Sequence, residues 1–128
     1  MAELQRVLYV EDEADIRTIA RLSLEAVGGM TVCLCASGAE AVEAAVSFRP
    51  ELILLDVMMP GMDGPTTLRA LRAVPELASV PVAFMTAKVQ PAELDNYRSM
   101  GAVDVITKPF DPMTLPDRLR AIWRGSGS

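Results

Sequence analysis

Residues that can do chemistry follow the short apolar segments of this sequence. Glu11 and Asp12 come directly after the first such segment, and Asp56 follows the third. Thr86 follows the fourth and Lys108 the fifth. Each residue alone has an ordinary structural explanation, such as a helix cap, a turn or a solvated strand end. If the segments are parallel strands, however, their carboxyl ends meet at the edge where open α/β sheets bind ligands, which predicts a functional site.

This combination of side chains predicts phosphoryl chemistry assisted by a metal ion. Three carboxylates brought together repel one another, and a bound cation removes that conflict. Mg²⁺ takes carboxylate oxygens together with water and phosphate oxygens. Lys108 and Thr86 offer an ammonium and a hydroxyl that can hold the oxygens of a phosphoryl group. Asp56, the central acid, is the candidate nucleophile, because a carboxylate can accept a phosphoryl group as an acyl phosphate.

The strands needed to position these residues are indicated by alternating sequence patterns. Short apolar runs alternate with longer segments of helical period, as expected for strands joined by crossover helices into a parallel sheet. The predicted strands cover residues 7–10, 31–36, 52–55, 80–85 and 103–106. The run 52–55 is apolar throughout, which is typical of a strand covered on both faces.

Five helices are predicted from residues with capping or helix-breaking preferences. These markers are Gly28 and Gly29 after a first helix over 14–27, Ser37 with Glu40 and then Arg49 and Pro50 around the second, Asp63 before the third, Pro91 and Gly101 around the fourth, and Asp111 with Pro112 before the fifth. Ser37 and Glu40 have capping-box spacing, in which each side chain accepts the backbone N–H of the other residue.

Composition and charge narrow the class of protein. The net charge of −5 disfavours nucleic acid and anionic lipid as direct partners. No signal peptide or membrane-spanning run is visible. Cys33 and Cys35 alternate along one predicted strand, too close for a relaxed disulfide, so we expect reduced thiols and a cytoplasmic location. We expect one domain over 1–124, with 125–128 a flexible tail that is either native or a cloning remnant.

Four motifs in sequence order resemble those of response-regulator receiver domains. They are LYVEDEADIR, LILLDVMMPGMDG, FMTAK and GAVDVITKPF, and the resemblance covers practically the whole chain. It implies an α/β fold of the flavodoxin-like (βα)5 type, a three-layer sandwich around a parallel five-stranded sheet of order 2-1-3-4-5. It also implies a phosphoacceptor domain of two-component phosphorelay signalling, which catalyses only its own phosphorylation and dephosphorylation.

The resemblance gives a role to each residue of the predicted site. Asp56 resembles the phosphoacceptor, and Glu11 and Asp12 resemble the acidic pair that binds Mg²⁺ with it. The backbone carbonyl of Met58 is the further metal ligand that the resemblance implies. Thr86 takes the switch role.

Three further features follow from the same resemblance. Lys108 takes the phosphate-binding role, and the family usually holds the bond from this lysine to the next residue, here Pro109, in the cis form. Ala87 resembles the small residue that leaves room for the phosphoryl group. The implied partners are a sensor histidine kinase or histidine phosphotransfer protein and a downstream protein bound through the fourth helix, fifth strand and fifth helix, with the chain a monomer or weak phosphorylation-dependent dimer.

The sequence departs from the family pattern at several positions. Glu11 stands where Asp is more common, and Val105 stands where the family commonly has a Tyr or Phe that turns inward with the switch threonine. We therefore expect the switch to work through Thr86 and repacking of the fourth helix, with weaker discrimination between the two states. Met58 and Lys88 flank the expected phosphoryl group, which predicts slow self-dephosphorylation.

Three alternative functions remain open at this level. A metal-dependent phosphatase of the haloacid-dehalogenase type would need a second acid two residues after Asp56, where this chain has Met58. A constitutive scaffold would keep the fold without phosphorylation, which the complete set of site residues disfavours. The chain can also be the receiver fragment of a larger regulator or hybrid kinase.

Overall fold

The computed structural model describes residues 3–87 and 90–126, and the strands of this part of the chain form one parallel sheet. They are β1 (Arg6–Val10), β2 (Thr31–Cys35), β3 (Leu52–Asp56), β4 (Val82–Thr86) and β5 (Asp104–Thr107). Their order across the sheet is β2-β1-β3-β4-β5, which confirms the predicted topology.

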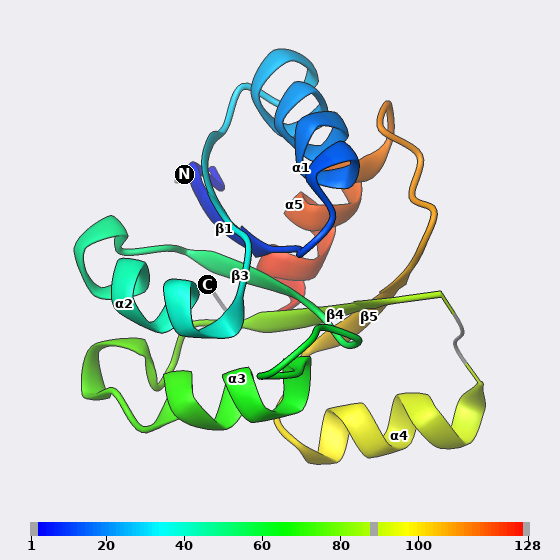
Figure 1. Ribbon diagram of the computed structural model, residues 1–128. Helices are drawn as coiled ribbons and strands as arrows, with labels where there is room; N and C mark the ends of the chain where they lie inside the picture. The colour runs from blue at the N-terminus through cyan, green and yellow to red at the C-terminus, as the bar shows by residue number, and fades with distance from the viewer. Residues whose placement is uncertain (1–2, 88–89, 127–128) are drawn as a thin grey trace.

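Helices cover both faces of this sheet and complete three layers (Figure 1). One face carries α1 (Ala14–Arg21), its π-helical continuation η1 (Leu22–Val27) and α5 (Leu115–Gly125). The other face carries α2 (Gly38–Phe48), α3 (Gly64–Arg72) and α4 (Pro91–Ser99). A short 3₁₀ helix, η2 (Pro75–Leu77), precedes β4. None of the helices in the described ranges is long and apolar enough to cross a membrane.

Alternation along the strands divides the apolar side chains into two cores. Successive side chains of a strand point to opposite faces of the sheet. Tyr9 and Leu54 therefore pack beneath α1 and α5, while Leu8 and Ile53 pack against the opposite layer. Every residue of β3 is buried, as predicted for a central strand. The sheet is therefore packed on both faces, and this packing holds the residues at the carboxyl ends of its strands in place.

Two predicted helix caps are present. The Asp63 Oδ1 atom accepts a hydrogen bond from the backbone N–H of Thr66 at 2.8 Å, and α3 begins at the next residue. The Ser37 hydroxyl accepts from the N–H of Glu40 at 3.2 Å at the start of α2. The Glu40 carboxylate accepts from the N–H of Ala36 at 3.3 Å, one residue earlier than a capping box requires.

The predicted start of the fifth helix at Asp111 is wrong. Asp111 organises a turn instead: its Oδ1 accepts from the N–H of Met113 at 2.9 Å, and its carbonyl accepts from the N–H of Leu115 at 2.9 Å. The helix begins at Leu115, so Pro116 lies in its first turn, where a missing N–H costs nothing. A helix from 112 would place this proline in its interior and break it.

The first and last helices differ in detail from the prediction. The helix predicted over 14–27 is α-helical to Arg21 and π-helical from Leu22 to Val27, with Gly28 as its C-cap. The π-helical turn buries Ser23, whose hydroxyl donates to the carbonyl of Pro112 at 2.5 Å and ties this segment to the loop before α5. At the other end, α5 includes Gly125, the first residue of the expected tail, and residues 127–128 lie outside the described ranges.

Candidate functional site

Lys108 lies between two buried carboxylates at the carboxyl edge of the sheet. Its Nζ atom is 3.0 Å from Glu11 Oε1 and 3.1 Å from Asp56 Oδ2. Glu11 is 0% exposed and Asp56 is 2% exposed. Carboxylates at this depth need a charged or hydrogen-bonded partner, and the ammonium group is that partner for both. The three residues from β1, β3 and β5 are thus brought together, although they are far apart in the sequence.

The register of the strands explains this convergence. Each of the three residues lies two positions after a core side chain beneath α1 and α5, in the pairs Tyr9–Glu11, Leu54–Asp56 and Ile106–Lys108. Because side chains two apart in an extended chain share a face, all three point to the same side of the sheet. Glu11 remains in this register, since its N–H donates to the carbonyl of Cys35 at 2.9 Å, which continues the pairing of β1 with β2.

Burial and charge act in opposite directions on the groups of the site. Burial alone would lower the pKa of Lys108, but hydrogen bonds to Glu11 and Asp56 and their negative charges raise it above its ordinary value. Burial raises the pKa of Tyr9 far above its ordinary value, and the charges of Glu11 and Asp56 raise it further. At neutral pH, Lys108 is therefore a cation and Tyr9 a neutral hydroxyl donor.

The three acids form a set of oxygen ligands suited to a hard cation. Glu11, Asp12 and Asp56 each offer a carboxylate oxygen, and these oxygens lie within 4.8 Å of one another. Oxygen ligands suit Mg²⁺, whereas softer metals favour nitrogen and sulfur. Lys108 supplies one positive charge to two of these carboxylates. A divalent cation would supply the charge balance that remains, so the residues present fit such an ion.

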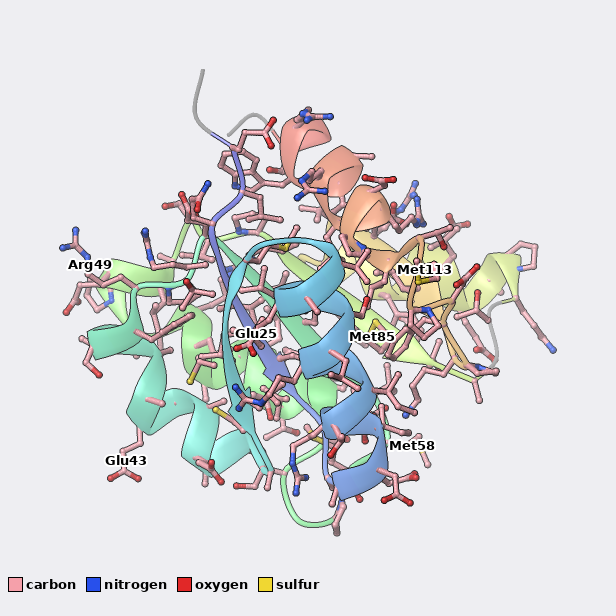
Figure 2. The ribbon with its side chains drawn as sticks, turned by 90° about the horizontal axis from the view of Figure 1, so that it is seen from above. Glu25, Glu43, Arg49, Met58, Met85 and Met113 are labelled. Carbon is pink, nitrogen blue, oxygen red and sulfur yellow. The ribbon has the colours of Figure 1, made fainter. Side chains whose placement is uncertain are left out.

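A cleft of about 450 Å³ opens above these residues. Besides Asp56, its walls include five predicted site residues, namely Asp12, Met58, Thr86, Ala87 and Lys108. Figure 2 shows Met58 beside the beginning of α1, and its side chain is 79% exposed, whereas Met85 is buried in the sheet. The bond between Lys108 and Pro109 is cis, as the sequence motif implied.

Two predicted site residues of the described part of the chain, Glu11 and Val105, do not line this cleft. Val105 is buried beneath the opposite layer, where it lies beside Phe84 in the pairing of β4 with β5. The ring of Phe84 packs edge-on against the ring of Tyr97 in α4, with ring centroids 5.1 Å apart. Val105 thus belongs to the packing between β5 and α4. Lys88 lies outside the described residues.

Sequence reasoning missed two side chains that hold Glu11. The hydroxyl of Tyr9 donates to Glu11 Oε1 at 3.3 Å, and the Arg17 guanidinium donates to the Glu11 carbonyl at 2.7 Å. Tyr9 resembles an ordinary core aromatic in the sequence, but its spacing of two from Glu11 was a signal that both share a face. Arg17 carried no comparable signal, because its contact depends on how α1 leaves the sheet.

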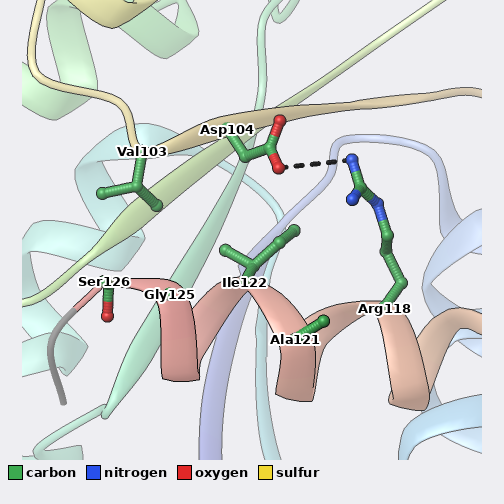
Figure 3. A pocket seen from close by; sticks show the side chains of 7 residues that line it. All are labelled: Val103, Asp104, Arg118, Ala121, Ile122, Gly125 and Ser126. Atoms are coloured by element: carbon green, nitrogen blue, oxygen red, sulfur yellow. Dashed lines mark ion pairs between the residues drawn. The ribbon is translucent and has the colours of Figure 1, made fainter.

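A second hollow, of about 500 Å³, lies between β5 and α5 and shares no lining residue with the cleft (Figure 3). Asp104 forms an ion pair with Arg118 of α5 at 3.3 Å, and Arg98 of α4 approaches the same carboxylate at 3.7 Å. Val103, 37% exposed, also lines the hollow. The Asp104 carboxylate, which lines this hollow, therefore links α4, β5 and α5.

A parallel sheet of this order, with three acids and a lysine gathered at its carboxyl edge, is the arrangement of a domain that accepts a phosphoryl group on one of the acids. Comparison with known families agrees: residues 7–120 match the response regulator receiver domain. The chain belongs to this family, which works in two-component signalling.

Individual relatives support this membership. The chain is 39% identical over 127 residues to the transcriptional regulatory protein CseB of Streptomyces avermitilis, covering 99% of this chain and 52% of that protein. It is 38% identical over 120 residues to the DNA-binding response regulator MtrA of Mycobacterium tuberculosis H37Rv, covering 94% of this chain and 51% of that protein. The chain thus spans about half the length of the curated relatives it matches.

Solved structures are similar over nearly their whole length. The chemotaxis protein CheY4 of Vibrio cholerae has a TM-score of 0.86 and 30% identity, covering 93% of this chain and 98% of that one. The signal receiver domain of a histidine kinase from Syntrophus aciditrophicus has a TM-score of 0.79 and 32% identity, covering 94% and 91%. Receiver folds of both kinds therefore match this chain.

Proposed function

We propose that Asp56 accepts a phosphoryl group from a phosphohistidine and that the resulting acyl phosphate switches the binding of a downstream protein. One observation carries this proposal: the Asp56 carboxylate lies at the cleft, 3.1 Å from the ammonium of Lys108. The ammonium is already placed to neutralise charge that develops on a phosphoryl group as it arrives.

The transfer follows from the chemistry of the residues around the cleft. An Asp56 carboxylate oxygen attacks phosphorus, the new O–P bond forms, and the N–P bond to the donor histidine breaks. Lys108 moves from the two carboxylates to the phosphoryl oxygens, and the hydroxyl of Thr86 binds another of them. Ala87 at the cleft wall has a side chain small enough to leave room for the group.

Glu11, Asp12 and Asp56, with the backbone carbonyl of Met58, would hold Mg²⁺ at this site. Bound there, the ion would neutralise charge on the transferring phosphoryl oxygens. The carboxylate oxygens within 4.8 Å of one another support this assignment.

The donor histidine lies outside this sequence, because these 128 residues contain no histidine. Membership of the receiver family implies a histidine kinase as a partner. We propose a sensor histidine kinase or a histidine phosphotransfer protein as the donor, and a small acyl phosphate as its substitute in vitro. We place this exchange in the cytoplasm, where Cys33 and Cys35 would stay as the free thiols that the structure shows.

We propose that the downstream protein binds to the face formed by α4, β5 and α5, the output surface. The acid Asp104 links these elements through its contacts with Arg98 and Arg118. The output is either a separate protein or a further unit of a longer chain, since CseB and MtrA are about twice as long as the region matched. The net charge of −5 favours a protein over nucleic acid as the direct partner of this face.

Val105 weakens the coupling between Asp56 and this face. Val105 is buried and has no aromatic ring that could turn between inward and outward positions, so Thr86 and the packing of α4 must transmit the change. Hydrogen exchange in α4, with and without beryllofluoride, measures this coupling. We expect a small change in the wild type and a larger one in Val105→Tyr; a large wild-type change that Val105→Tyr abolishes overturns the idea.

Slow self-dephosphorylation is proposed from Met58, which is largely exposed at the cleft that the hydrolytic water must cross. The decay of the phosphorylated protein in Mg²⁺ measures its lifetime. Decay within seconds at room temperature contradicts the proposal.

Intact-mass measurement after incubation with acetyl phosphate and Mg²⁺ tests the central proposal. The wild type should gain one phosphoryl group, and Asp56→Asn should gain none. Asp63→Asn is the matched control, because it makes the same change to an acid seven residues away that caps α3 instead of lining the cleft. Failure of the wild type to gain the group, where a known receiver does, would favour the constitutive scaffold.

A further inference from the structure

Glu11 is a fully buried carboxylate whose oxygens are held by donors from three places. Oε1 lies 3.0 Å from Lys108 Nζ and 3.3 Å from the hydroxyl of Tyr9. Oε2 accepts from the backbone N–H of Glu13 at 3.3 Å. Two of these donors are side chains, and both act on the same oxygen.

Only one of the two side-chain donors can stay in place throughout phosphorylation. Lys108 has a second partner in Asp56, and its flexible stem allows its ammonium to follow a phosphoryl group. Tyr9 is 0% exposed and packed in the core beneath α1 and α5, so its ring has no room to move. When Lys108 leaves, Tyr9 becomes the sole side-chain donor to Oε1 among the contacts of the described residues.

The length of the Glu11 side chain is what makes this contact possible. Tyr9 and Glu11 lie two apart at the end of β1 and share a face of the sheet. An aspartate at this position would be shorter by one methylene, about 1.5 Å, and its carboxylate would draw away from the phenol. The buried hydroxyl would then lose its partner, which a buried tyrosine normally requires.

We propose that Tyr9 is a positioning residue of the phosphorylation site, whose hydroxyl holds the carboxylate of Glu11 after Lys108 has moved to the phosphoryl group. The inference rests on the proposed function, because it assumes that Lys108 changes partners. The inference explains why position 11 holds glutamate and not the shorter aspartate: only the longer side chain reaches the hydroxyl of Tyr9. Without the hydroxyl, Oε1 of Glu11 keeps no side-chain hydrogen bond from the described residues once Lys108 has left, a loss confined to the phosphorylated state.

The test is a double-mutant cycle with Tyr9→Phe, Glu11→Asp and the double variant. The probes are Mg²⁺ alone and beryllofluoride in saturating Mg²⁺, which stands for the phosphoryl group on Asp56; both affinities are measured by calorimetry. Urea unfolding of the unliganded proteins measures any purely structural effect. Tyr9→Phe removes one oxygen and keeps the ring, so the core packing is retained.

Tyr9→Phe should weaken beryllofluoride binding about tenfold, as expected for one lost hydrogen bond to a charged group. It should weaken Mg²⁺ binding about twofold at most, because Lys108 still holds Oε1 in that state. In the Glu11→Asp background, Tyr9→Phe should have no effect on either ligand.

Three results overturn the inference. One is an equal effect of Tyr9→Phe on both ligands, and another is the same effect in both backgrounds, which would mean that Tyr9 acts through packing. The third is a loss of unfolding free energy with no change in beryllofluoride affinity. If Glu11→Asp binds neither ligand, the comparison of the two ligands in the wild-type background decides. Wild-type protein that binds Mg²⁺ but no beryllofluoride would refute the proposed function itself, and the inference with it.

Discussion

Lys108 has a role in the folded state besides the one proposed for it in phosphoryl transfer, because it is the cation shared by Glu11 and Asp56. Lys108→Gln removes the positive charge that both buried carboxylates share, and it should cost roughly 3 kcal/mol of unfolding free energy. Mg²⁺ should restore more stability to this variant than to the wild type, since the ion replaces the missing charge. Urea unfolding with and without Mg²⁺ measures both effects.

The control for this prediction is Arg21→Gln, which removes an ion pair of similar length at the surface. Arg21 lies 3.0 Å from Glu25, but both side chains are about half exposed. Such pairs contribute roughly 0.5 kcal/mol, and Mg²⁺ should not alter the result. If Lys108→Gln proves as harmless as Arg21→Gln, the ammonium does not have the structural role assigned to it.

Gly64 joins α3 to the end of β3 more closely than any larger residue permits. A Cβ atom at this position would lie 2.7 Å from the carbonyl oxygen of Asp56 and 2.9 Å from the Cα of Val57. Gly64→Ala must push the backbone of Asp56, the proposed phosphoacceptor, aside, so we expect a loss of roughly 1–3 kcal/mol and a lower yield of phosphoprotein. Thermal unfolding and intact mass measure these two quantities.

Gly125→Ala is the matched control, because a Cβ atom there meets nothing within 4 Å at the end of α5. It should leave the phosphorylation yield unchanged. A normal yield in Gly64→Ala would contradict the view that the contact between Gly64 and Asp56 fixes the acceptor.

Among the elements, the strands were predictable to within two residues, because their apolar runs are distinct. Their exact ends depend on distant partners. The strand predicted from residue 80 begins at Val82, since the N–H of Val80 donates to Leu77 in the turn after η2. The strand predicted from 103 begins at Asp104 and reaches Thr107, whose partner is Thr86. Such pairings are set by the tertiary structure and not by local sequence.

The helices α1 and α5 show a different limit of sequence reasoning. The π-helical turn after Arg21 lies where this segment packs on α5, and a Cβ at Gly28 would lie 2.9 Å from Pro116. Pro116 also marks the start of α5 at Leu115. The sequence contains a second pair typical of a helix start, Asp111–Pro112, and the prediction followed that pair. At the site, topology alone predicted that Glu11, Asp56 and Lys108 converge, but the contact from Tyr9 depends on the depth of its ring in the core.

The cap of α3 gives a prediction at the scale of the element. Hydrogen bonds from Thr66 lower the pKa of Asp63 below its ordinary value. Its contribution to stability is therefore complete above a pH of about 4 and is lost as the pH falls through the lowered pKa. At pH 7, Asp63→Ala should cost about 1 kcal/mol, while Asp63→Asn, which keeps an acceptor, should cost much less.

Urea unfolding at pH 7 and in acid checks this cap. The difference between wild type and Asp63→Ala should shrink as the carboxyl becomes protonated. A difference that stays constant down to pH 2 would show that the cap does not depend on the charge.

At the scale of the whole molecule, the sheet separates two cores with different tasks. The core beneath α1 and α5 continues directly into Glu11, Asp56 and Lys108, so its packing positions these side chains. The core beneath α2, α3 and α4 contains Val105 and Phe84 and includes the packing of α4. Thr86 follows Phe84 at alternate spacing on β4 and so faces the same layer. If Thr86 moves on phosphorylation, as proposed, the second core is the one that has to adjust.

The second core also contains Cys35, which makes the stability of the whole fold sensitive to alkaline pH. Burial raises the pKa of the Cys35 thiol to about 12, and the neighbouring Cys33 and Glu40 add to this effect. An unfolded chain ionises this thiol near its ordinary value, 9.0. Its contribution to stability is therefore intact below that pH and is lost as the pH rises from about 9 toward 12.

Cys35→Val removes the ionisable group and keeps an apolar side chain of similar size. Between pH 9 and pH 10 the wild type should lose up to about 1.4 kcal/mol more unfolding free energy than this variant, the effect of one proton per pH unit. Urea unfolding under reducing conditions measures the slopes. Above pH 10 both proteins should lose further stability, because the buried hydroxyl of Tyr9 also resists ionisation in the folded state. Equal slopes below pH 10 would mean that the Cys35 thiol ionises in the folded protein, and that the second core admits water even before phosphorylation.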